Sequence, residues 1–186
     1  MKQDLKEVNL KPFLKEAGAC IGKAEISAEA AKRKVEQVYF KKELRQYSSE
    51  QVDVWVAELR THYEQVIDCT VCGNCCSKLE PGVEDHEIEK LAEALSEDPV
   101  SFRRNRVDYD GRALFLKTKP CLFLKDCKCT VYEIRPAACA GFPHLDQPHF
   151  KYKQSVWENY QICPIVFEVV EGLKQALDFK MPGSEE

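Results

Sequence analysis

The chain contains no long hydrophobic run. Its first residues, from Met1 to Val8, mix lysine with acidic residues and lack the apolar core of about 7–15 residues that a secretory signal peptide needs. Nowhere do about 20 apolar residues follow one another, as a membrane-spanning helix would require. We therefore expect a cytoplasmic protein whose thiols stay reduced.

Basic charge and the common active-site motifs are also scarce. The 27 Lys and Arg residues face 31 Asp and Glu residues, so the formal net charge is −4 and gives no case for nucleic-acid binding. The sequence has no Gly-rich phosphate loop, no dinucleotide fingerprint and no local Ser-His-Asp arrangement. Its 186 residues, 44% of them hydrophobic, suit one domain of ordinary core size with a helical extension.

Cysteine, in contrast, is abundant. Nine of the ten cysteines lie between residues 69 and 163, beginning with the run Cys69-Thr-Val-Cys72-Gly-Asn-Cys75-Cys76 and continuing with Cys121, Cys127, Cys129, Cys139 and Cys163. Thiols this dense in a reducing compartment indicate ligands for soft metal centres rather than a disulfide framework.

The spacing of these cysteines leaves two kinds of metal centre open. A C-x2-C-x2-C run supplies three ligands from one loop, as in bacterial ferredoxins, where a Cys-Pro completes the set. Here the Cys-Pro is remote, at Cys163-Pro164, so one centre could draw on the first loop and Cys163. The distal cysteines form no second C-x2-C knuckle, which favours an iron–sulfur cluster slightly over zinc. The neighbours Cys75 and Cys76 could serve different centres.

The periodicity of the chain predicts a mainly α fold with small β elements. Helices are expected at 24–47 and 48–67 as an antiparallel hairpin, then at 84–95, 99–106 and 165–179, with a short strand at 112–117 after the Asp110-Gly111 turn. We expect two parts: an N-terminal arm and helical hairpin over residues 1–66, and a cysteine-cluster domain over residues 67–180. The hairpin is expected to dock on the cluster domain.

Particular side chains are expected to define the helices. Val35, Val38 and Tyr39 share one face of the first helix, which predicts their burial. Ser48, with Gln51 three residues later, predicts an N-cap for the second helix. Asp85 is the expected cap of the helix at 84–95.

Some polar residues near the cysteines carry weaker expectations. A helix beginning at Pro136 would bring its positive end close to Cys139 and lower the pKa of that thiol. Arg135 could donate to thiolates or form an ordinary salt bridge. His144 and His149 lie in a loop near Cys139 and are possible ligands, whereas His62 and His86 are expected to be solvated and Cys20 to be incidental.

One family resemblance follows from these motifs. The combination consists of the Cys69–Cys76 run, Cys121-x-Phe-Leu124, Cys129-Thr-Val-Tyr132-Glu-Ile-Arg135-Pro136-x2-Cys139-x2-Phe142-Pro143 and Cys163-Pro164. It resembles the YkgJ-type cysteine-cluster family, also called CxxCxxCC, of zinc- or iron-chelating domains, over about residues 66–178. The resemblance implies the ligand set Cys69, Cys72, Cys75, Cys76, Cys121, Cys129, Cys139 and Cys163, and leaves Cys127 and Cys20 outside it.

The resemblance and the spacing together leave three functions open. The first is a metal-binding protein, with an iron–sulfur cluster or alternatively zinc ions, in a redox, sensing or structural role. The second is an enzyme of the protein-lysine N-methyltransferase type, because a flagellin lysine N-methylase is among the family's relatives. The third is a thiol–disulfide or metal-delivery protein that uses a C-x2-C pair. Metal ions are the expected partners, a protein partner is possible, and neither nucleic acid nor membrane is expected.

Overall fold

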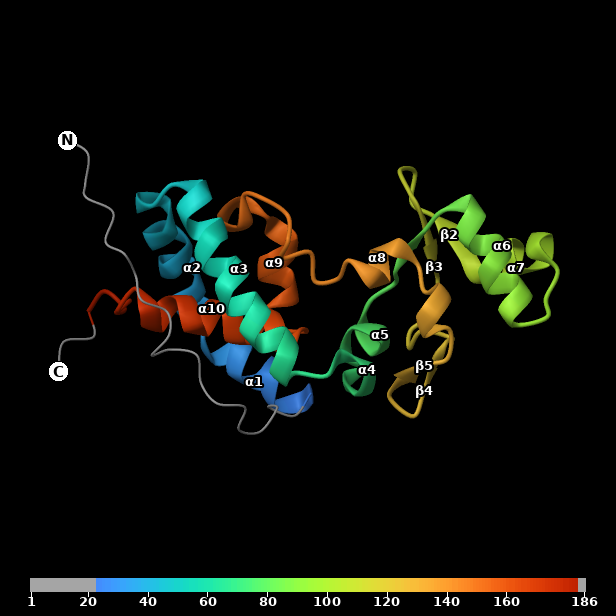
Figure 1. Ribbon diagram of the computed structural model, residues 1–186, viewed down its shortest axis with the longest axis horizontal. Coiled ribbons are helices and arrows are strands. Elements are labelled where there is room, and N and C mark those ends of the chain that lie inside the picture. The colour runs from blue at the N-terminus through green and yellow to red at the C-terminus, as the bar shows by residue number, and fades with distance from the viewer. Residues whose placement is uncertain (1–22, 184–186) are drawn as a thin grey trace. The chain divides into compact units, whose positions relative to one another are not determined.

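The computed structural model describes residues 23–183, which form two separate units (Figure 1). Of the described residues, 23–67 and 143–183 form the helical unit, and Asp68–Phe142 form the cysteine unit. The sequence placed residues 67–180 in one domain, whereas the structure groups the segment after residue 142 with the N-terminal helices. Docking of the helical hairpin on the cysteine-rich part stays a prediction.

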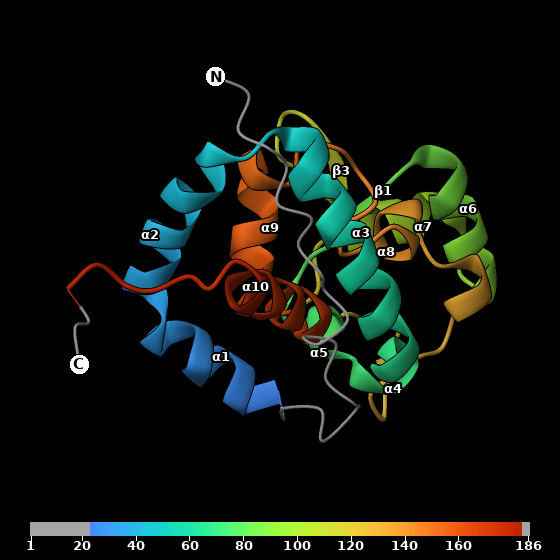
Figure 2. The same cartoon turned by 60° about the vertical axis from the view of Figure 1, so that its left-hand side comes forward.

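The helical unit is built around one C-terminal helix. Its elements are α1 (Lys23–Lys32), α2 (Lys34–Glu43), η2 (Leu44–Gln46), α3 (Ser49–Val66), η4 (Phe150–Tyr152), α9 (Gln154–Asn159) and α10 (Pro164–Ala176). Helix α10 lies between α1 and α3 (Figure 2), and most of its residues are buried. Gly172 permits the close approach of α3, because a Cβ there would lie 3.0 Å from Leu59 Cδ2. This packing explains why the C-terminal segment belongs to the helical unit.

The expected face of the first helix is wrong, although the helical conformation is confirmed. The helix is interrupted at Arg33, which has φ −96° and ψ 12°. After this break Val35 and Val38 are 62% and 51% exposed, and the buried residues are Phe40 and Leu44. Tyr39 is also exposed, at 38%. The physical reason is that α2 turns the side that carries Phe40 toward the core, where this ring packs edge-on against Trp157 and Phe179.

A buried ionic network joins α10 to α1, α2 and α9. One carboxylate oxygen of Glu171 accepts hydrogen bonds from Tyr160 Oη and Lys174 Nζ, both at 2.6 Å. The other oxygen accepts from Arg33, and Lys174 also pairs with Glu36 at 3.1 Å. Burial raises the pKa of Tyr160, and its hydrogen bond to Glu171 raises it further. Each buried charge therefore has an opposite charge beside it, as burial requires.

The cysteine unit combines short helices with two small antiparallel sheets. Its elements are α4 (Cys69–Cys72), α5 (Asn74–Lys78), β1 (Gly82–Val83), α6 (Asp85–Ala94), α7 (Pro99–Arg106), β2 (Val107–Tyr109), β3 (Leu114–Leu116), β4 (Leu124–Lys125), β5 (Lys128–Cys129), η3 (Tyr132–Ile134) and α8 (Ala137–Ala140). One sheet has the strand order β1-β3-β2, and β4 and β5 form a hairpin. The expected mainly helical fold with small β elements is confirmed.

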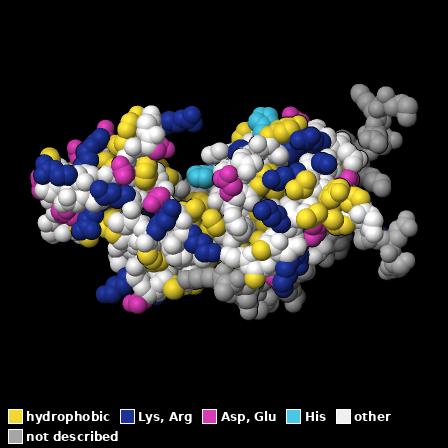
Figure 3. All heavy atoms as spheres, turned by 180° about the vertical axis from the view of Figure 1, so that it is seen from behind, with side chains coloured by type: hydrophobic (Ala, Val, Ile, Leu, Met, Phe, Trp, Pro, Cys, Tyr) yellow, Lys and Arg dark blue, Asp and Glu magenta, His cyan; other side chains and the backbone are white. Residues whose placement is uncertain are grey.

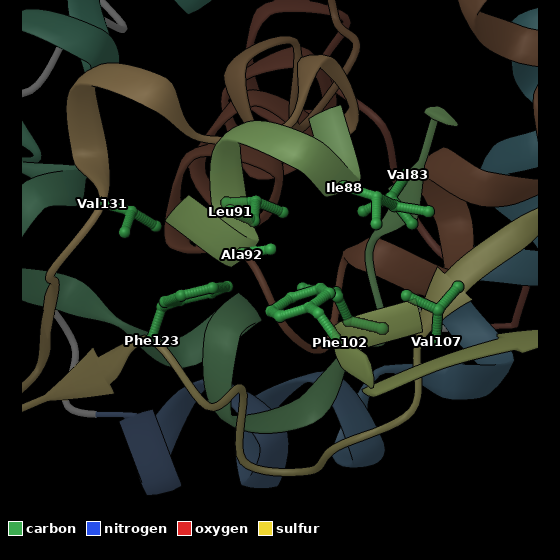
Figure 4. Close-up of a cluster of buried hydrophobic side chains, with 9 residues drawn as sticks. Val83, Ile88, Leu91, Ala92, Phe102, Val107, Phe123 and Val131 are labelled. Atoms are coloured by element: carbon green, nitrogen blue, oxygen red, sulfur yellow. The ribbon is translucent and has the colours of Figure 1, made fainter. Parts of the chain in front are cut away.

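A compact apolar cluster holds the cysteine unit together (Figure 4). Phe102 of α7 and Phe123, just before β4, stack with ring centroids 6.5 Å apart beneath the apolar side of α6. Cys121, two residues before Phe123, and Cys129, at the end of β5, pack against this cluster. The core therefore fixes two of the predicted ligands directly.

Side-chain caps begin two of the longer helices. Ser48 accepts from the Gln51 backbone N–H at 3.1 Å, which confirms the predicted cap of α3. The cap of α6 is Glu84 rather than Asp85, because Glu84 forms a reciprocal capping box with Glu87 and Asp85 pairs with Arg103.

On the face drawn in Figure 3, basic and acidic side chains are interspersed. Within residues 23–183, no helix has both the length and the apolar character needed to cross a membrane.

Candidate metal centre

Four cysteines of the cysteine unit share one electrostatic neighbourhood. We call Cys76, Cys121, Cys129 and Cys139 the four-thiol group. Cys76 interacts electrostatically with each of the other three, and Cys139 interacts with both Cys121 and Cys129. The group draws on separate stretches of chain, so only the tertiary fold brings these thiols together.

Backbone hydrogen bonds place each member of the group. Cys76 lies on α5, and its carbonyl oxygen accepts from the Cys121 backbone N–H at 2.8 Å. The Cys121 carbonyl accepts from Leu124 N–H at 2.9 Å, where β4 begins, and Leu124 pairs with Cys129 across the hairpin. These contacts connect three of the four thiols through only a few backbone bonds.

The fourth thiol is positioned by a different set of contacts. Cys139 lies on α8, whose first residue, Ala137, donates its N–H to Glu87 Oε1 of α6 at 2.7 Å. Just before α8, Arg135 stacks over the Tyr132 ring with its guanidinium carbon 3.7 Å from the ring centroid, and donates to the Tyr132 carbonyl at 2.6 Å. The start of α8 is therefore held by Glu87 of α6, and the Arg135 guanidinium is held by Tyr132.

Three thiols of the group, those of Cys121, Cys129 and Cys139, favour their neutral form in the absence of metal. Burial raises the pKa of Cys121 and of Cys129, and burial together with the three neighbouring thiols raises the pKa of Cys139 to about 12. The expectation that the helix start lowers the pKa of Cys139 is therefore wrong. Arg135 does lower the pKa of Cys129 and Cys139, but its effect is smaller than that of burial.

The remaining thiols of the first motif lie on a loop, which we call the three-thiol loop, formed by Cys69, Cys72 and Cys75. Asp68 caps α4 by accepting from the Thr70 backbone N–H at 2.8 Å, and one helical turn then carries Cys69 and Cys72. Gly73, with φ +58°, turns the chain into α5. Cys75 Sγ lies 3.8 Å from Cys76 Sγ, so the three-thiol loop and the four-thiol group meet at this adjacent pair.

The other candidate ligands lie in the helical unit or outside the description. Cys163 is buried at the N-cap of α10 and donates its N–H to the Asn159 carbonyl at 2.7 Å. His144 and His149 belong to the helical unit, not to the unit that carries Cys139. His149 donates its backbone N–H to Asp53 at 2.7 Å, and Cys20 lies outside the described residues.

The chemistry of the donor set fits a soft metal. No disulfide joins two of the nine described cysteines. In residues 23–183, no group of three or more Cys, His, Asp or Glu side chains is already spaced to hold an ion. Neighbouring thiols raise the pKa of Cys121, Cys129 and Cys139. Thiols grouped in this way are nevertheless the donors that a zinc ion or an iron–sulfur cluster prefers, because a nearby cation reverses that repulsion.

Sequence reasoning missed the position of one cysteine. Cys127, which was left outside the ligand set, lies at the tip of the β4–β5 hairpin with its backbone against Gly73 of the three-thiol loop. The two-residue spacing between β4 and β5 could have indicated this hairpin, but its contact with the loop is a tertiary feature.

Comparison with known proteins gives one match. The family model CxxCxxCC, described as "Putative zinc- or iron-chelating domain", matches residues 68–164, more than half of the chain. No match was found among curated proteins or among solved structures.

Proposed function

Because this chain belongs to the CxxCxxCC family of zinc- or iron-chelating domains, we propose that the four-thiol group binds zinc or an iron–sulfur cluster. The observation that carries this proposal is the electrostatic coupling of Cys76, Cys121, Cys129 and Cys139, which come from α5, the turn before β4, β5 and α8. A zinc site and an iron–sulfur cluster each take four protein ligands, which is the number of thiols in this group.

A structural role fits the elements that carry these thiols. Helix α8 has four residues, and β4 and β5 have two residues each. Elements this short are not stable on their own in water, so their positions depend on tertiary links. A bound metal centre would supply such a link by cross-linking α5, the hairpin and α8. Arg135, held over Tyr132, would compensate part of the negative charge of the thiolates.

The three-thiol loop is proposed as a second ligand set. Cys69, Cys72 and Cys75 would supply three thiolates from one loop. Cys163, which the family pattern includes among the ligands, lies in the helical unit and is not assigned to this set. The division into two sets accounts for the adjacent pair Cys75 and Cys76, with one residue for each set. The enzyme and thiol–disulfide alternatives stay predictions from the sequence.

The decisive experiment measures metal on anaerobically purified, full-length protein by elemental analysis and ultraviolet–visible absorption. A visible sulfur-to-iron band would identify an iron–sulfur cluster, and stoichiometric zinc with no visible band would identify zinc. Cys129→Ser should lose the metal of the four-thiol group, whereas Cys20→Ser, outside the family pattern, should keep full loading. Wild-type protein without zinc or iron, or full loading of Cys129→Ser, would contradict the proposal.

A further inference from the structure

The tip of the β4–β5 hairpin lies directly on the three-thiol loop. A Cβ built on Gly73 would lie 2.9 Å from the Cys127 carbonyl oxygen, 3.2 Å from Cys127 Cα and 3.0 Å from Leu124 Cδ1. Gly73 stands between Cys72 and Cys75. The backbone of Cys127 therefore contacts the middle of the segment that supplies three predicted thiolates, and α4 packs against β5 beside it.

The hairpin turn presents the Cys127 residue to solvent. Asp126 and Cys127 both have positive φ, 50° and 63°, as in a two-residue type I′ turn. Glycine or asparagine is the usual second residue of such a turn, so cysteine is an unfavourable choice for the backbone. Cys127 is exposed, as is Cys69 at the start of the loop, whereas Cys72 and Cys75 are half-buried. Solvent can therefore reach both Cys127 and one end of the three-thiol loop.

We infer that Cys127 is a capture ligand, a thiol that first binds a divalent metal ion from solution and then passes it to the three-thiol loop. This inference rests on the proposed function of that loop. On capture, the Cys127 thiol releases its proton to water, and a sulfur–metal bond replaces a bond between the ion and a water or buffer ligand. On transfer, a loop thiol releases its proton and forms its bond to the ion, while the bond to Cys127 breaks and the Cys127 thiolate takes a proton from water. The oxidation state of the ion does not change.

Proximity explains why such a thiol would accelerate loading. An ion held on Cys127 meets the loop thiolates as an intramolecular partner, at an effective concentration on the order of millimolar. Free metal in a cell or a dilute assay is far scarcer. Because the benefit is kinetic, removal of Cys127 should change the rate of loading and leave the final site complete.

The test follows Co²⁺ uptake by metal-free, reduced, full-length protein in a stopped-flow spectrometer, through the sulfur-to-cobalt absorption. Cys127→Gly removes the thiol and suits the positive φ of the turn, so the hairpin is preserved. Cys127→Ser keeps the size of the side chain, and Cys20→Ser is the matched control for removal of one thiol. The inference expects a several-fold slower loading phase in both Cys127 variants, an unchanged rate in Cys20→Ser and the same final spectrum in all four proteins.

Two results would overturn the inference while leaving the proposed function intact. Unchanged loading rates in Cys127→Gly would show that the thiol is a bystander. A final spectrum that lacks one sulfur-to-cobalt contribution would show that Cys127 is a resident ligand and not a capture ligand. A wild-type protein that takes up no Co²⁺ would instead contradict the proposed function itself, and the inference with it.

Discussion

Replacement of Gly73 by alanine tests the contact between the hairpin and the three-thiol loop. Two costs are expected. The left-handed φ of +58° costs an alanine about 1–2 kcal/mol relative to glycine. The added Cβ also lies 2.9 Å from a backbone carbonyl oxygen, which a flexible side chain cannot relieve, and such overpacking costs about 1–3 kcal/mol more. The free energy of unfolding of the metal-free cysteine unit should therefore fall by about 2–5 kcal/mol.

Gly111→Ala provides the matched control for this experiment. Gly111 also has a positive φ, +93°, but nothing lies within 4 Å of its ideal Cβ, so it carries the conformational cost alone. The excess loss of stability in Gly73→Ala over Gly111→Ala thus isolates the steric contact with Cys127. In Gly73→Ala the added Cβ should also push the hairpin away from the loop and so weaken metal binding by the loop. In Gly111→Ala metal binding should be unchanged.

The assay must report on the cysteine unit. Both tryptophans, Trp55 and Trp157, lie in the helical unit, so their fluorescence reports on that unit. Amide hydrogen exchange measured by mass spectrometry on peptides that cover β4, β5 and the loop is suitable, because it gives the free energy of local opening. If Gly73→Ala opens no more readily than Gly111→Ala, the close approach of hairpin and loop is refuted.

Cys139→Ser should lower the metal content and the melting temperature of the loaded protein, and an unchanged value of both would exclude it as a ligand. In metal-free protein, the neutral form of Cys139 is the stabilised one, because its pKa rises from 9.0 to about 12. Its contribution to stability should be present below about pH 9 and be lost as the pH rises toward 12. Thermal unfolding at both ends of this range should show a smaller loss in Cys139→Ser. Glu171→Gln should cost the helical unit about 3 kcal/mol in urea unfolding, since it removes the buried carboxylate that Lys174 and Arg33 share. Arg60→Ala, which breaks an exposed pair, should cost at most about 1 kcal/mol, and equal losses would contradict the role of the network.

Local signals in the sequence were sufficient for several elements. The apolar spacing in α3 and the Ser48 cap predict that helix well, because both signals act within one or two turns. The Asp110-Gly111 turn predicts the strand that becomes β3, since the turn depends on neighbouring residues: Asp110 accepts from the backbone N–H groups of Arg112 and Ala113. The ligand pattern identified the family for the same reason: its motifs are short and specific.

Long-range contacts decide what the sequence could not predict. Helix α10 joins the N-terminal helices through its contact with α3, a pairing across about a hundred residues that no local pattern encodes. The electrostatic interaction of Cys76 with Cys121, Cys129 and Cys139, in addition to its chain neighbour Cys75, likewise depends on the path of the chain through the core. The raised pKa of Cys139 follows first from its burial and then from the neighbouring thiols, and both depend on the tertiary fold.

The discontinuous helical unit sets an order of events during synthesis. The chain of the cysteine unit is complete at Phe142, whereas α3 must wait for α10, which ends at Ala176. At about 5–20 residues per second, the ribosome needs about 2–7 s to add the intervening residues. During that interval the cysteine unit has its entire sequence and α3 still lacks the helix that covers it. On the nascent chain, the segment inserted in the middle is thus ready to fold before the helices that precede it.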